Sequence, residues 1–237
     1  MPTGREVSSL KKSIDFTRMT KVFIGQNAVS AFFFWLVRIF IRPKIYGLEK
    51  LRGLLKLHKS SGLGIVFVSN HINKSDPLLI LHSMPLSLKV GLGAITFLGK
   101  EGLFNKPWKD RLMRSLGVVP VRDNSLLGLR GILKLIEKGE KIFYFPEGTV
   151  SKDGNLGEDS GSANFYAKHA KFILQPVRVS GMRGWKKDWK NIFCFRRKYT
   201  ICFLEPLIVE RGTQINALAE TQKGTQNYVS DAKVKGD

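Results

Sequence analysis

Short apolar runs alternate along most of the chain with segments whose apolar residues recur at helical spacing. Runs of this kind, bounded by turn residues, are typical of buried strands. The expected strands are 64–68, 95–98, 117–122, 141–145 and 172–179. The helical spacing predicts helices over 78–84, 109–116, 126–138 and 163–170. Because strands and helices alternate, we expect an α/β fold with a mixed, largely parallel sheet flanked by helices.

The N-terminal part of the chain has a different pattern. Apolar residues recur at helical spacing over 16–31, and 29–37 carries no charge before Arg38 interrupts it. This apolar run is shorter than the ~20 residues that a membrane-spanning helix needs. It favours a helix that lies in one leaflet, with flanking basic side chains at the headgroups, although a helix packed on the protein's own core fits the same pattern. We therefore expect an N-terminal helical membrane anchor over 1–45 and an α/β domain over 46–237.

The charge of the chain indicates an anionic partner. Its 39 Lys and Arg residues against 19 Asp and Glu residues give a net charge of +20. Nucleic acid, anionic lipid and a phosphorylated substrate all fit this charge. The 16 Phe and four Trp residues favour lipid, because aromatic side chains settle at membrane interfaces. Cys194 and Cys202 form no disulfide framework, and no cluster has the spacing of a metal site.

One turn carries the strongest candidate for chemistry. His71 follows the expected strand 64–68, and Asp76 precedes Pro77 at the start of the next helix. Five helical residues rotate by about 140°, so the two side chains can meet only if His71 lies on the loop. Asp76 could then accept the Nδ1 proton of His71 and leave Nε2 as a general base. Alternatively, Asp76 is only a helix cap and His71 a loop residue.

Three further charged residues follow expected strands: Lys100, Arg122 and Glu147. Loops after parallel strands meet at one edge of an α/β sheet, so these side chains should gather near His71 and Asp76. A base, two cations and a carboxylate suit a hydroxyl nucleophile carried on a phosphorylated molecule. The cations would bind the phosphate, and the base would take the hydroxyl proton.

Four blocks of the sequence, in this order, resemble the glycerolipid acyltransferase family, and most closely its bacterial 1-acylglycerol-3-phosphate acyltransferases. The blocks are Asn70-His71-x4-Asp76, Gly117-x3-Val121-Arg122, Phe145-Pro-Glu-Gly-Thr149 and the late-strand proline Pro176. The resemblance covers roughly residues 45–210, and the hydrophobic N-terminal segment fits it.

The resemblance implies direct acyl transfer without an acyl-enzyme. His71 would deprotonate the sn-2 hydroxyl of 1-acylglycerol-3-phosphate (lysophosphatidic acid), Asp76 would orient His71, and the hydroxyl would attack the thioester of acyl-ACP or acyl-CoA. The substrate-binding residues implied are Lys100, Arg122, Glu147, Gly148 and Thr149. No cofactor and no metal are expected. We expect a monotopic protein bound to anionic lipids at the cytoplasmic face of the inner or plasma membrane.

Other functions fit parts of the pattern. A family member with another acceptor, such as glycerol-3-phosphate or a lyso-ornithine lipid, would keep the same chemistry. A basic nucleic-acid-binding protein would explain the charge, but the sequence holds no recognisable nucleic-acid motif and the 32–41 aromatic cluster would be unexplained. A lipid-binding scaffold without catalysis would have no need of His71, Asp76 and Glu147.

Overall fold

A single mixed sheet forms the centre of the protein. The computed structural model describes residues 19–28, 43–73, 76–121, 126–151, 157–181 and 199–223. Within them the sheet has eight strands, in the order β1-β7-β6-β2-β5-β3-β4, with β8 also paired to β6. The strands are β1 (Lys44–Tyr46), β2 (Ile65–Ser69), β3 (Thr96–Lys100), β4 (Val118–Val121), β5 (Lys141–Tyr144), β6 (Phe172–Ser180), β7 (Thr200–Phe203) and β8 (Leu207–Val209).

Most neighbouring strands are parallel, as predicted. The pairs β1–β7, β2–β5, β2–β6, β3–β4 and β3–β5 are parallel, whereas β6 pairs antiparallel with β7 and β8. Pro120, which has no N–H to donate to a second neighbour, lies in β4 at the end of the strand order. The α/β fold class expected from the sequence is therefore confirmed.

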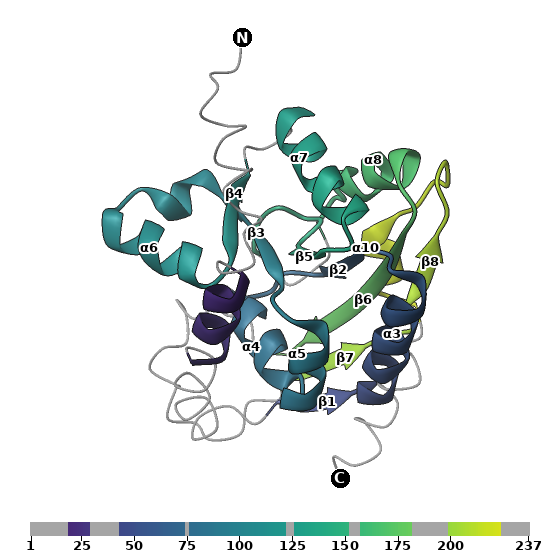
Figure 1. Ribbon diagram of the computed structural model, residues 1–237, viewed down its shortest axis with the longest axis horizontal. Coiled ribbons are helices and arrows are strands. Elements are labelled where there is room, and N and C mark those ends of the chain that lie inside the picture. The colour runs from purple at the N-terminus through teal and green to yellow at the C-terminus, as the bar shows by residue number, and fades with distance from the viewer. Residues whose placement is uncertain are drawn as a thin grey trace.

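Helices cover both faces of the sheet (Figure 1). They are α3 (Leu48–Ser61), α4 (Asp76–Ser83), α5 (Leu86–Leu92), α6 (Pro107–Ser115), α7 (Leu126–Glu137), α8 (Ser162–His169) and α10 (Ala217–Glu220), with a 3-10 helix η2 (Glu101–Phe104). The buried side chains of α3, α4 and α5 pack with Phe67 and Phe143 in one core. Those of α7, α8 and α10 pack with Val66 and Val68 in a second core on the other face. Alternate residues of β2 thus enter opposite cores, which explains why its sequence is apolar throughout.

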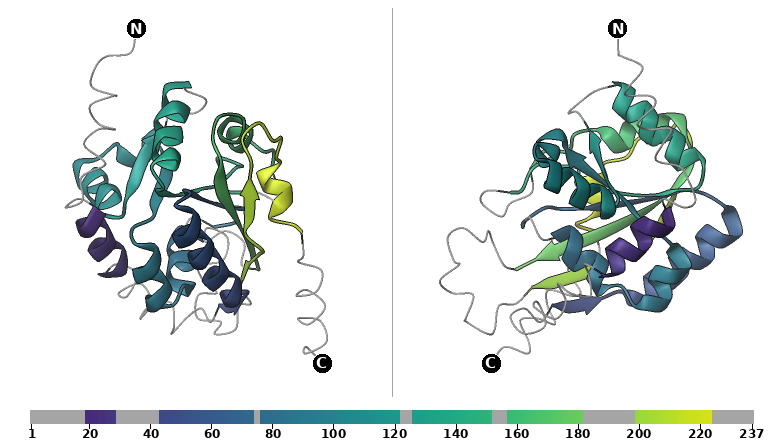
Figure 2. Two further views of the ribbon diagram at one scale, coloured as in Figure 1. Left: turned by 45° about the vertical axis from the view of Figure 1, so that its right-hand side comes forward. Right: turned by 60° about the vertical axis from the view of Figure 1, so that its left-hand side comes forward.

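The N-terminal helical segment 19–28 is attached to the domain beside α6, as both views in Figure 2 show. Gln26 is buried, and its Nε2 donates to the carbonyl oxygens of Ile95 and Leu116 at 2.6 and 2.9 Å. Gly117 has φ +72° and no room for a Cβ, which would lie 2.6 Å from Cγ1 of Val22. This close approach requires glycine at the start of β4. The remainder of the expected 1–45 anchor lies largely outside the described residues.

No helix among the described segments is long and apolar enough to cross a bilayer.

Candidate active site

The loops that carry the candidate residues meet at one edge of the sheet. The strands β2, β3 and β5 run parallel, so their carboxyl ends lie on the same side. His71 follows β2, Lys100 is the last residue of β3, and Glu147 follows β5. Arg122 comes directly after β4 in the sequence but lies outside the described residues. The predicted gathering of these loops is confirmed for His71, Lys100 and Glu147, whereas for Arg122 it stays a prediction.

His71 and Asp76 form the predicted pair, in which the carboxylate accepts the Nδ1 proton. Nδ1 of His71 lies 2.9 Å from Oδ2 of Asp76. The carboxylate is the acceptor, so Nδ1 carries the proton and Nε2 presents its lone pair. The His71 side chain is 14% exposed and that of Asp76 is fully buried. An imidazole whose Nδ1 is bound to a buried carboxylate, with Nε2 left as the basic nitrogen, has the geometry of a general base.

Asp76 organises the whole loop before α4. Its Oδ2 also accepts the backbone N–H groups of Ile72 and Asn73, both at 2.8 Å. These donors precede the helix, whereas an ordinary N-cap accepts N–H groups from inside it. The carboxylate therefore fixes the loop that carries His71 rather than capping α4.

Tyr199 completes the environment of Asp76. Its hydroxyl donates to Oδ1 of Asp76 at 2.6 Å, and both side chains are fully buried. Burial, and then the negative charge of Asp76, raise the pKa of Tyr199 well above its usual range. The phenol is thus a firm donor to the carboxylate at neutral pH. Sequence reasoning missed this residue, because no motif surrounds it and it lies 123 positions from Asp76.

Phe145 sets the plane of the imidazole. The rings of His71 and Phe145 stack with centroids 4.0 Å apart and an interplanar angle of 18°. Asp76 fixes one ring nitrogen and Phe145 fixes the ring plane, so the direction of Nε2 is determined. Nε2 makes no hydrogen bond to any residue in the described part of the chain.

Glu147 ties together two loops of the site. Its Oε1 accepts the backbone N–H of His71 at 3.0 Å, and its Oε2 accepts that of Gly157 at 3.1 Å. Ser151 also donates its N–H to the carbonyl oxygen of His71, at 2.7 Å. The chain around the imidazole is thus anchored from the β5 side as well as from Asp76.

The other expected binding residues lie at the open part of this edge. Gly148 and Thr149 are exposed, and a Cβ on Gly148 would have no atom within 4 Å. Lys100 is exposed as well. Arg178, near the end of β6, was not expected from the sequence; burial lowers its pKa and the charge of Glu147 opposes that change. Within the described segments no group of three or more His, Cys, Asp and Glu side chains could hold a metal ion.

The sequence is similar to proteins that share one named activity. Over 146 residues the chain is 33% identical to the chloroplastic 1-acyl-sn-glycerol-3-phosphate acyltransferase of Arabidopsis thaliana; the match covers 60% of this chain and 37% of the plant protein. It is 24% identical to a probable 1-acyl-sn-glycerol-3-phosphate acyltransferase of Mycoplasma pneumoniae over 54% of this chain and 48% of that protein. The chain thus spans less than half the length of these curated relatives.

The fold matches a solved structure. The crystal structure of the 1-acyl-sn-glycerophosphate (LPA) acyltransferase PlsC from Thermotoga maritima superposes with a TM-score of 0.59, covering 100% of this chain and 86% of that one. At 17% sequence identity this likeness concerns the fold alone.

The sequence model of the family described as Acyltransferase matches residues 42–180. This region holds β1 to β6, the His71–Asp76 pair and Glu147. Because the match takes in more than half of the chain, the protein belongs to the acyltransferase family.

Proposed function

We propose that this protein moves a fatty acyl group from acyl-ACP or acyl-CoA to the sn-2 hydroxyl of 1-acylglycerol-3-phosphate, giving phosphatidic acid. The relatives that are named 1-acyl-sn-glycerol-3-phosphate acyltransferases support this acceptor. The observation that carries the proposal is the 2.9 Å contact between Nδ1 of His71 and Asp76, which leaves Nε2 available at the sheet edge.

The reaction needs one base and no covalent enzyme intermediate. Nε2 of His71 removes the proton of the acceptor hydroxyl while its oxygen attacks the thioester carbonyl carbon. The tetrahedral intermediate collapses with cleavage of the C–S bond, and the leaving thiolate takes the proton from His71. The imidazolium formed in between is stabilised by the adjacent Asp76 carboxylate, whose own position is held by Tyr199. No cofactor is needed, since the thioester supplies the acyl group and the driving force.

The acceptor phosphate binds beyond the imidazole, on the β3–β4 side of the edge. Lys100 and Arg122 supply the positive charge, and an arginine can grip a phosphate through two N–H groups. Gly148 and Thr149, exposed next to Glu147, line the approach of the glycerol part. Glu147 was expected from the sequence to contact the substrate; its bonds to His71 and Gly157 support a second role in holding the site together.

A comparison of acceptors tests this proposal. Purified full-length protein in detergent is assayed with one acyl thioester and three acceptors: 1-acylglycerol-3-phosphate, glycerol-3-phosphate and 1-acylglycerol. The proposal predicts efficient transfer to the first alone. Equal rates with 1-acylglycerol would remove the phosphate-binding role of Lys100 and Arg122, and a preference for glycerol-3-phosphate would assign the enzyme to another acceptor. Chelators should leave the rate unchanged.

The substrate and product are lipids, and one surface of the protein suits a bilayer. Leu103, Trp108 and Leu112 on η2 and α6 are 46%, 61% and 37% exposed. Ile24 on the adjoining 19–28 helix is 61% exposed. Exposed apolar side chains gathered on adjacent elements are uncommon on surfaces that face only water.

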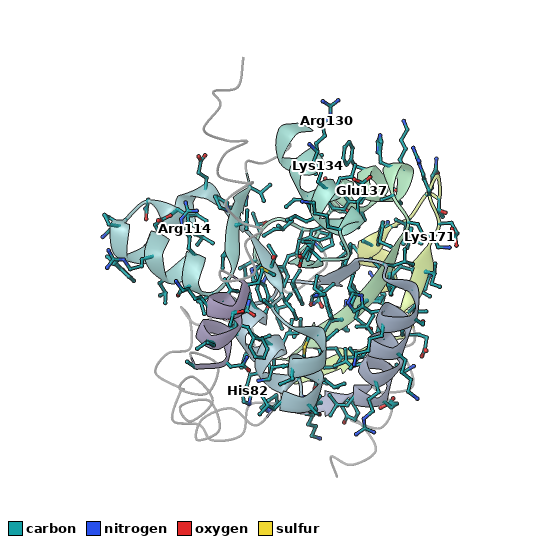
Figure 3. The ribbon with its side chains drawn as sticks, viewed as in Figure 1. His82, Arg114, Arg130, Lys134, Glu137 and Lys171 are labelled. Carbon is teal, nitrogen blue, oxygen red and sulfur yellow. The ribbon has the colours of Figure 1, made fainter. Side chains whose placement is uncertain are left out.

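Basic residues surround this surface, which we define as Ile24, Leu103, Trp108 and Leu112 and call the α6 surface. Lys106, Lys109, Arg111 and Arg114 lie in or next to α6, and Figure 3 labels Arg114 there. The pairing of aromatic and basic side chains suits the interface of an anionic membrane. In the sequence, the 29–41 apolar run follows directly after the 19–28 helix. We propose that the α6 surface and this run contact the same membrane.

A further inference from the structure

Asn70 is a buried polar residue to which the proposed reaction gives no role. It follows the last residue of β2, comes directly before His71 and is 3% exposed. A buried amide that lacks hydrogen-bond partners destabilises the fold, whereas an aliphatic side chain at the end of a buried strand carries no such cost. The partners of this amide therefore indicate what it does.

Both partners of the Asn70 side chain belong to one residue of the neighbouring strand β6. Its Nδ2 donates to the carbonyl oxygen of Val179 at 2.9 Å, and the N–H of Val179 donates to its Oδ1 at 2.8 Å. Val179 is buried as well, at 1% exposure. One amide side chain thus satisfies both hydrogen-bonding groups of a buried backbone unit, as a neighbouring strand would.

The register of the two strands shows which groups a regular ladder would use here. Ser69, the last residue of β2, is opposite Val177, and β6 continues beyond it. In a parallel ladder, a residue bonds the carbonyl before its partner and the N–H after it. A continued β2 would therefore offer Val179 the carbonyl oxygen of Asn70 and the N–H of Ile72.

Both of these backbone groups have other partners in the structure. The carbonyl oxygen of Asn70 accepts the hydroxyl of Ser69 at 3.0 Å. The N–H of Ile72 donates to Oδ2 of Asp76 at 2.8 Å. The main chain has therefore left the ladder, and the side chain of Asn70 takes its place opposite Val179.

The next residue is turned toward the strand on the other side of β2. The N–H of His71 donates to Glu147, and its carbonyl oxygen accepts the N–H of Ser151; both partners follow β5. We propose that Asn70 is a positioning residue for His71: its amide replaces the next backbone unit of β2 and so fixes the point at which the chain leaves the sheet. It acts through the backbone of His71 and takes no part in bond making.

Loss of the amide would change the loop as well as the stability. The N–H and the carbonyl oxygen of Val179 would be buried without partners. The N–H of Ile72 is the donor that the ladder would supply to this carbonyl, so Val179 then competes with Asp76 for it. The loop moves toward β6, and the direction of Nε2 of His71 changes with it.

The inference rests on the proposed acyl transfer, and two substitutions at Asn70 test it. Asn70→Ala removes both bonds to Val179. Asn70→Gln keeps the amide but adds a methylene group, so the same bonds can form only with the chain displaced from β6. We expect kcat for transfer to 1-acylglycerol-3-phosphate to fall at least tenfold in both variants, with KM for both substrates within about twofold, because displacement of a catalytic group costs rate.

Asn164→Ala is the matched control for a purely structural effect. Oδ1 of Asn164, on α8, accepts the N–H of Ile215 at 2.6 Å, so the same substitution removes another bond between distant segments. The control should lower the melting temperature and leave kcat unchanged where the protein is folded. Wild-type kcat in either folded Asn70 variant would overturn the positioning role. A raised KM at unchanged kcat would also overturn it and make Asn70 a substrate contact.

Amide hydrogen exchange keeps this inference separable from the proposed function. In Asn70→Ala, the peptides that contain His71 and Val179 should exchange faster than in wild type, while peptides of α7 exchange at the wild-type rate. If wild type transfers acyl groups to none of the acceptors, the proposed function fails, and exchange still decides whether Asn70 holds the end of β2. Unchanged exchange in both peptides would contradict that role.

Discussion

The hydroxyl of Tyr199 donates a 2.6 Å hydrogen bond to Oδ1 of Asp76, the carboxylate whose other oxygen receives Nδ1 of His71. Tyr199, the residue directly before β7, thus supports the candidate base through the buried Asp76 carboxylate. The bond means that the base depends on a residue outside the four sequence blocks.

Replacing Tyr199 by Phe should weaken both the fold and the reaction. The change leaves Oδ1 of Asp76 buried without its donor, which costs about 1–3 kcal/mol of unfolding free energy. The carboxylate then has less support for orienting His71, so kcat should fall roughly tenfold, the equivalent of about 1.4 kcal/mol. Chemical denaturation and steady-state assays measure the two effects. Tyr166→Phe, a buried tyrosine on α8, is the control. A fully active, fully stable Tyr199→Phe protein would show that the bond has no such role.

The raised pKa of Tyr199 predicts weaker folding in alkali. In the folded protein the phenol keeps its proton above its ordinary pKa of 10.0, while in the unfolded chain it loses the proton there. The stabilisation is complete below pH 10 and is lost as the pH rises from 10 through the folded-state value, at about 1.4 kcal/mol per pH unit. Unfolding free energies measured across this range should fall less steeply in Tyr199→Phe than in wild type. Parallel slopes in the two proteins would contradict the assignment.

Gln26 should determine how firmly the 19–28 helix is attached. Its amide bonds the carbonyl oxygens of Ile95 and Leu116 in a buried position. Gln26→Leu has a similar size but leaves both acceptors unpaired, at a cost of about 1–3 kcal/mol. We expect a lower melting temperature and faster proteolysis near the N-terminus. Asn27→Leu, at the next and less buried position, should have a smaller effect. If the two variants lost the same stability and were cleaved at the same rate, the Gln26 bonds would not be what attaches the helix.

Carboxylates introduced on the α6 surface should release the protein from membranes. Trp108→Glu and Leu112→Glu place carboxylates where the proposal has a bilayer, so binding to vesicles containing anionic lipid should fall at least tenfold in flotation assays. Ile208→Glu on β8 is the control, because Ile208 is 46% exposed and β8 lies on the opposite side of the molecule from α6 (Figure 1). Equal loss in the control, or none in the α6 variants, would argue against this surface.

The sequence predicts the local parts of the site and misses the distant ones. The contact of His71 with Asp76 follows from a strand, a short loop and a helix start within a few residues, so local geometry determines it. Tyr199 and Val179 reach the site only through the pairing of β7 and β6 with other strands, and no pattern in one sequence specifies which strands pair.

Two helices illustrate the same limit. The basic segment 51–59 has only a weak helical pattern in the sequence, yet α3 runs over 14 residues, and its Leu51 and Leu54 are buried in the first core. In the 19–28 helix, Ile24 belongs to the apolar residues at helical spacing and Gln26 lies between them, so the pattern predicts Ile24 as the packed residue. The structure has the reverse, with Ile24 61% exposed and Gln26 2% exposed, because Gln26 satisfies backbone groups of the domain.

The most direct measurement is acyl transfer to 1-acylglycerol-3-phosphate by His71→Ala, with His169→Ala as the control. His169 is also partly buried, and its Nδ1 lies 2.8 Å from a backbone oxygen of α8 rather than from a carboxylate. Removal of a general base should lower kcat by about 10²-fold or more while KM changes little. The account predicts this loss for His71→Ala alone; a His71→Ala enzyme that transfers acyl groups at the wild-type rate would contradict it.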